Sequence, residues 1–164
     1  MKCAWSLVSR SSAMMLSFAA VAPSLASAQS ASNLPAEFCP SLQRVTALAI
    51  GQDRFQSITG KPREGSYSDT TVSLPGWRDC SLYGSRTYAC DSRALPSADK
   101  AREEQSSILR EVAACLGEGW TEDRSRSSPV YVILHQRGSK ASITLSTDQN
   151  EKDEHVVRLI LFLR

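Results

Sequence analysis

The stretch that decides the fold reads CSLYGSRTYAC and spans residues 80–90. Two short runs of strand-forming residues flank a turn at Gly84 and Ser85. A three-residue loop centred on Ser85 places Cys80 directly opposite Cys90. Opposed residues of a non-hydrogen-bonded pair have the Cβ separation that a disulfide bridges. The sequence therefore predicts a β-hairpin closed by a Cys80–Cys90 disulfide.

The oxidation of these cysteines depends on the compartment, and residues 1–28 predict export. Lys2 and Arg10 form a basic N-terminal region before a ten-residue apolar stretch at 13–22, and residues 26–28 read Ala-Ser-Ala, the small-x-small pattern of a signal peptidase site. The apolar stretch is about half of the roughly 20 residues that a membrane-spanning helix needs. We therefore expect a signal peptide that is cleaved after Ala28, and a mature chain that is periplasmic or secreted.

Export changes the interpretation of the remaining cysteines. Cys3 leaves with the predicted signal peptide, and the four that remain are an even number in an oxidising compartment, which indicates two disulfides. With Cys80 and Cys90 joined in the hairpin, Cys39 pairs with Cys115. The alternatives are a zinc site or a redox pair, but the chain has no CxxC motif and only two histidines. Structural disulfides are the prediction, with no metal and no cofactor.

Beyond the leader, the sequence predicts one small α+β domain at residues 37–164, preceded by a flexible lead-in at residues 29–36. Apolar residues keep a helical spacing over two segments, 40–58 and 97–116. Strand-like runs occupy residues 67–74, both halves of the hairpin, 130–136, 141–146 and 155–164. Elements in this order predict an antiparallel sheet of five to six strands, with two helices packed on one face and two stabilising disulfides.

The second helix and the last strand are the most informative of these elements. Ser97 suits the N-cap of the helix, and Gly117 suits a left-handed C-cap. Gln105 and Cys115 lie on the apolar face of the helix. Residues 155–164 are apolar on both faces of a strand, which predicts a central, covered position in the sheet.

The charge balance excludes partners that are held by a strong electrostatic field. Lys2 and Arg10 lie in the predicted signal peptide, so the mature chain carries 17 Lys and Arg against 17 Asp and Glu. A neutral chain gives no reason to expect nucleic acid or an anionic membrane surface as a partner. No apolar stretch after the leader is long enough to span a bilayer, so no membrane span is expected either.

Candidate chemistry is sparse. His135 and His155 are the histidines that could act as a general base, but no motif ties a nucleophile to either of them. The loop at residues 148–154 gathers acidic side chains, yet it lacks the turn glycine of a calcium loop and holds Lys152 in its middle. We expect a solvated hairpin loop there, and no catalytic residue.

The best candidate for a binding surface is the hairpin region. Arginine and aromatic residues are enriched at protein interfaces, and both types gather here. The residues that we select are Trp77, Arg78, Tyr83 and Arg86. Trp77 follows a tight Pro-Gly turn, which either displays the indole for binding or uses it to close one end of the core.

Three functional classes remain. The first is an exported, non-catalytic binding protein, such as an inhibitor, an immunity protein or an accessory subunit of an envelope assembly, with a protein partner. The second is a periplasmic chaperone or assembly factor, which requires a hydrophobic groove. The third is a small hydrolase that uses a strand histidine. The lack of catalytic motifs and the two predicted disulfides favour the first.

Overall fold

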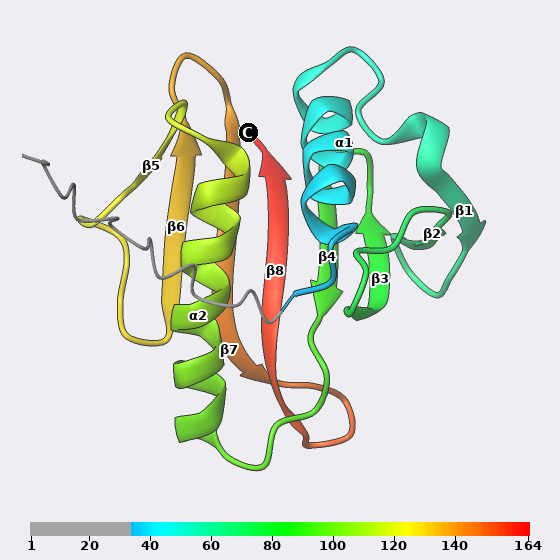
Figure 1. Cartoon of the computed structure of the whole chain (residues 1–164). Helices are drawn as coiled ribbons and strands as arrows, with labels where there is room; N and C mark the ends of the chain where they lie inside the picture. Colours follow the sequence, from blue (N-terminus) through cyan, green and yellow to red (C-terminus); the bar gives the residue numbers. More distant parts are fainter. Residues whose placement is uncertain (1–33) are drawn as a thin grey trace, which may run out of the picture. The chain divides into compact units, whose positions relative to one another are not determined.

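The computed structural model describes residues 34–164, which form two helices and an eight-stranded antiparallel sheet (Figure 1). The helices are α1 (Phe38–Ile50) and α2 (Ala98–Leu116), with a short 3-10 helix, η1 (Gln56–Ile58), after α1. The strands are β1 (Thr59–Pro62), β2 (Tyr67–Thr70), β3 (Arg78–Tyr83), β4 (Thr87–Asp91), β5 (Trp120–Glu122), β6 (Tyr131–Gln136), β7 (Ala141–Gln149) and β8 (His155–Leu163). The α+β class is confirmed, but the strand count is eight rather than five to six.

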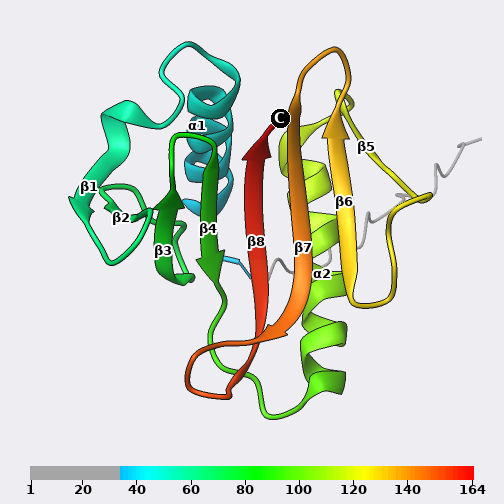
Figure 2. The same cartoon turned by 180° about the vertical axis from the view of Figure 1, so that it is seen from behind.

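The sheet has the order β1-β2-β3-β4-β8-β7-β6-β5. Both helices lie on one side of it, and no helix of residues 34–164 lies on the opposite side (Figures 1 and 2). We call this uncovered side the open face. Among residues 34–164, no helix is both long and apolar enough to cross a membrane. The predicted signal peptide and residues 29–33 of the lead-in lie outside the described residues, while Leu34 packs against the core.

The two strands that the sequence did not predict are the edge strands. β1 lies between the expected helix at 40–58 and the expected strand at 67–74, and β5 lies between the expected helix at 97–116 and the expected strand at 130–136. Both have only three or four residues and are mostly exposed. Such short, mostly exposed strands are too brief to show a hydrophobic alternation, although Trp120 of β5 packs against the core.

The first helix ends earlier than its apolar spacing indicated. We expected it to continue through residue 58, but α1 ends at Ile50, where the Gly51 N–H bonds the carbonyl of Ala47. Phe55 then adopts a left-handed backbone conformation, with φ of 68°, and its side chain is fully buried. Phe55 is therefore in the core, as its spacing suggested, but it lies in a turn and not in a helix.

The second helix matches its prediction closely. The hydroxyl of Ser97 accepts a hydrogen bond from the backbone N–H of Lys100, and Gly117 takes a positive φ of 76°. Gln105 is buried on the apolar face, where its amide donates to the carbonyl of Leu145 at 2.7 Å. This bond attaches α2 to β7 and gives the buried amide of Gln105 a partner.

Both predicted disulfides are present. Cys80 and Cys90 are joined across β3 and β4, with Cα atoms 4.1 Å apart, and the ladder register Ser81–Ala89 makes them direct opposites. The Cys39–Cys115 bond connects the start of α1 to the end of α2. One disulfide thus connects the two helices, and the other connects two neighbouring strands of the sheet.

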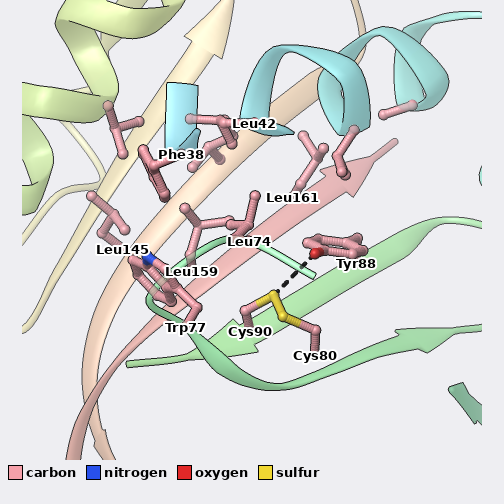
Figure 3. Close-up of a cluster of buried hydrophobic side chains, with 14 of the residues drawn as sticks. Phe38, Leu42, Leu74, Trp77, Cys80, Tyr88, Cys90, Leu145, Leu159 and Leu161 are labelled. Carbon is pink, nitrogen blue, oxygen red and sulfur yellow. Dashed lines mark hydrogen bonds between the residues drawn. A yellow bond between two sulfur atoms is a disulfide. The ribbon is translucent and has the colours of Figure 1, made fainter. Parts of the chain in front are cut away.

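The core lies between the helices and the sheet, and Figure 3 shows its centre. Trp77 belongs to this core: its side chain is only 9% exposed and stacks on Phe38, with ring centroids 6.1 Å apart. The indole is therefore not displayed after the Pro-Gly turn. It closes the core, which was the other of the two roles considered for it.

β8 is central, as predicted, but it is covered on one side only. It pairs with β4 and β7, and Leu159 and Leu161 point into the core. The alternate residues point to the open face, where Phe162 remains 37% exposed. The apolar residues on both sides of β8 predicted a covering layer on each side, but the side that belongs to the open face is exposed to solvent.

Candidate functional site

Strand alternation assigns a defined set of side chains to the open face. In β4, Tyr88 and Cys90 point into the core, so the residues between and beside them point the other way. The ladder to β8 places Thr87, Ala89 and Asp91 opposite Phe162, Ile160 and Arg158 respectively. The same alternation puts Ser81 and Tyr83 of β3 on the open face.

A cleft of about 820 Å³ opens on this face over β2, β3, β4 and β8. Its floor contains the small side chains Ser81, Thr87 and Ala89. The loop between β1 and β2 lines one side, and the loop between β7 and β8 lines the other. The hollow follows from this composition, because small residues on the central strands leave space that the longer residues of the flanking segments do not fill.

Arg158 lines the cleft, and all three nitrogens of its guanidinium donate to carboxylates. Its Nε and Nη2 donate to the two carboxylate oxygens of Asp91 at 2.7 and 3.0 Å, and its Nη1 donates to Asp148 at 2.8 Å. The hydrogen bond to Asp91 is the main cause that raises the pKa of Arg158. Because two carboxylates pair with one guanidinium, these three side chains together carry a net negative charge.

Two exposed tyrosines line the cleft beyond Arg158. Tyr67 of β2 and Tyr83 of β3 are direct ladder partners, and their rings lie 5.1 Å apart at an interplanar angle of 53°. The residues are 50% and 52% exposed. An aromatic pair on an uncovered sheet face is a surface that a partner can desolvate with little rearrangement.

Arg78 fixes one wall of the cleft. Its Nη2 donates to Glu154 at 2.9 Å, and its Nε donates to the carbonyl of Ser92 at 3.0 Å. Asn150 donates to the same oxygen of Glu154 and accepts the backbone N–H groups of Lys152 and Glu154. The hydrogen bond from Asn150, followed by the charge of Arg78, lowers the pKa of Glu154. The β7–β8 loop is therefore attached to the start of β3.

The structure separates the four residues that the sequence selected for binding. Tyr83 lines the cleft, and Arg78 supports its wall. Arg86 is exposed in the turn between β3 and β4, outside the cleft lining, and Trp77 is in the core. Tyr67, Asp91 and Arg158 were missed. Tyr67 begins a predicted strand and was therefore detectable, but nothing in the sequence links Asp91 to Arg158.

The chain matches no protein-family model, no curated protein and no solved structure. No relative therefore supplies a substrate or a partner. Function is therefore inferred from this chain's own residues, beginning with the cleft on the open face.

The side-chain partners of His135 within the described part of the chain are Asp123 and Arg126, neither of which is a hydroxyl or a thiol. His135 Nε2 lies 3.2 Å from the carboxylate of Asp123, which resembles the base-and-orienting-acid half of a catalytic triad. The nearby hydroxyl of Ser125, however, donates to Asp123 and not to the imidazole. His155 is half-buried at the start of β8. Within residues 34–164, no group of three or more His, Cys, Asp and Glu side chains is arranged to hold a metal.

The Asp123 cluster predicts a pH dependence of stability. Hydrogen bonds from Ser125, then from Arg126, hold the pKa of Asp123 well below its ordinary value of 3.8. A lowered pKa stabilises the fold above that ordinary value and stops doing so as the pH falls below it. We expect Asp123→Asn to lower the melting temperature at neutral pH, and its difference from wild type to shrink below about pH 4. Thermal melts across this range, with Glu122→Gln as the control, test this; a constant difference contradicts it.

Proposed function

We propose that the protein is an exported, non-catalytic binding protein whose partner protein docks in the open-face cleft. The observation that carries this proposal is the exposed Tyr67–Tyr83 pair beside a hollow on the one side of the sheet that no helix covers. Inhibitors, immunity proteins and accessory subunits of envelope assemblies are the classes that fit. The two disulfides support an oxidising, exported setting.

The rigidity of the cleft supports a binding role. Ladder hydrogen bonds hold its floor, the ion pair of Arg78 with Glu154 holds the β7–β8 loop, and the Cys80–Cys90 disulfide closes the hairpin that carries Tyr83. A surface that is ordered before association loses less conformational entropy on binding. The same partner contacts therefore yield a higher affinity than they do on a flexible loop.

The lining of the cleft favours one specific partner over many unfolded clients. Most of its side chains are charged or polar, and the apolar contribution comes from Ala89, Ile160 and the rings of the two tyrosines. A chaperone that holds unfolded chains needs a continuous apolar groove, because apolar surface is what its clients share. Charged lining residues instead discriminate between partners.

Loss of the tyrosine pair tests the docking site. We expect Tyr67→Ala with Tyr83→Ala to reduce recovery of the partner at least about tenfold, because interface aromatics often contribute 2 kcal/mol or more. The measurement is affinity capture of the tagged protein from the cells that export it, with mild cross-linking and mass spectrometry. Tyr131→Ala is the matched control, since Tyr131 is also exposed on the open face, in β6.

The supporting result is a stoichiometric protein that wild type and Tyr131→Ala capture and that the double variant does not. Equal recovery by all three proteins contradicts docking in the cleft. Many substoichiometric clients contradict the single partner and support a chaperone. Melting temperatures of the variants establish that any loss of capture is not a loss of fold.

A further inference from the structure

The cleft lining holds more unpaired carboxylates than unpaired cations. Three lining carboxylates, Glu64, Asp79 and Glu151, form no ion pair or side-chain hydrogen bond with any residue that the structure describes. The only lining cation in the same situation is Lys152. The lining therefore keeps an excess of unpaired negative charge, although the predicted mature chain as a whole is neutral.

The paired groups do not reverse this excess. Arg63 is neutralised by Asp69 at the side of the cleft. Arg158 is neutralised twice, by Asp91 and by Asp148, so this cluster adds a further negative charge. An anionic ligand meets no free guanidinium here. A cationic ligand meets unpaired carboxylates and a field of favourable sign.

The tyrosine pair adds a second, independent preference for a cation. The faces of aromatic rings attract ammonium and guanidinium groups that lie within about 6 Å of the ring centroid. Tyr67 and Tyr83 are half-exposed and tilted relative to each other, which presents ring surface toward the cleft that both of them line. Aromatic rings beside unpaired carboxylates form an environment that suits the side chains of arginine and lysine.

We propose that the occupant of the cleft is an extended, basic segment of the partner protein, with an arginine or lysine side chain on the Tyr67–Tyr83 pair. This inference rests on the proposed function and specifies the chemistry of its partner. The cavity, at about 820 Å³, falls within the range of roughly 300–1,000 Å³ that is typical of ligand pockets. It has room for more than one side chain of an extended segment.

The test uses a fluorescent Gly/Ser peptide that carries arginine at alternate positions, and the same peptide with glutamine in place of arginine. Fluorescence anisotropy with the mature protein measures both affinities. We expect the arginine peptide to bind at least about tenfold more tightly. Its affinity falls as salt rises from about 20 to about 300 mM, because screening shortens the range of charge interactions.

Two charge-matched variants distinguish a local site from bulk charge. The double variant Asp79→Asn with Glu151→Gln removes two cleft carboxylates, and we expect it to lower the affinity for the arginine peptide several-fold. Glu118→Gln with Glu122→Gln removes the same charge from exposed positions near β5, and leaves the affinity unchanged. Equal weakening by both pairs, or equal affinity for the two peptides, overturns the inference. Spermidine is tested in the same assay. If it binds as tightly as the peptide, and with the same dependence on Asp79 and Glu151, the occupant of the cleft is a small cation and not a protein segment.

Failure of this inference is distinguishable from failure of the proposed function. If the tyrosine double variant loses the captured partner while the two peptides bind equally, the cleft is a docking site for a partner that is not basic. If the double variant keeps the partner, the proposed docking site is wrong whatever the peptides do. The two experiments therefore test the location and the chemistry separately.

Discussion

Replacing Trp77 with alanine is expected to lower the free energy of unfolding by about 3–5 kcal/mol, the usual cost of truncating a buried aromatic side chain. Trp77 packs in the core against Phe38, near Leu145 and Leu159 (Figure 3). Neither helix moves freely to fill the cavity, because a disulfide joins α1 to α2. Denaturant unfolding monitored by circular dichroism measures the change.

Trp77→Phe is the matched control, since it keeps an aromatic ring in the same position and loses only part of the volume. We expect this variant to lose less stability than Trp77→Ala. An unchanged midpoint for Trp77→Ala contradicts the buried position and returns the indole to the surface. The variant also separates stability from binding, because Trp77 does not line the cleft.

Removing the Cys39–Cys115 disulfide is expected to cost more stability than removing Cys80–Cys90. The first joins residues 76 apart and the second joins residues 10 apart. By the chain-entropy relation, the longer loop contributes about 4.5 kcal/mol and the shorter one about 3 kcal/mol, because each disulfide restricts the unfolded chain according to the loop that it closes. Double alanine variants and urea unfolding under oxidising conditions give both values.

The order of the two losses is the decisive outcome. A larger loss for Cys80→Ala with Cys90→Ala contradicts the entropic account, and shows that packing of the buried Cys90 within the core dominates instead. Reduced wild type is the reference for both variants, since it lacks both cross-links without any change of side chain.

The parts of the fold that were predictable have a local cause. Ser97 and Gly117 set the ends of α2 through bonds to near neighbours, and the spacing of Cys80 and Cys90 around a short turn set their register. Each signal lies within a few residues of its effect. The Cys39–Cys115 pairing then followed by elimination, because only two cysteines remained.

The parts that were missed depend on tertiary contacts. β1 and β5 pair at the edges of the sheet with partners that hold them in place, and their few exposed residues carry no pattern. The cleft brings Asp91 to Arg158 across 67 positions of sequence. The two-residue alternation within a strand shows which of its residues share a face. Which charged residues pair across strands depends on which strands are neighbours in the sheet.

Trp77 shows the same limit within the candidate site. A Pro-Gly turn is compatible with an indole on either side of the chain, and only the position of Phe38 on α1 decides the matter. Arg78, its neighbour, was selected as a direct contact but acts by holding Glu154 and the loop wall. Residue type and turn pattern therefore do not decide which side chains of this region are buried and which are exposed.

The position of β8 has a consequence for the order in which the molecule assembles. β8 follows every other strand in sequence, yet it lies between β4 and β7 and supplies the hydrogen bonds that connect the two groups of strands. Without β8, one edge of β4 and one edge of β7 have no partner, and open strand edges are prone to pairing with other chains. Closure requires long loops to form first, so folding is slow relative to a protein with local contacts.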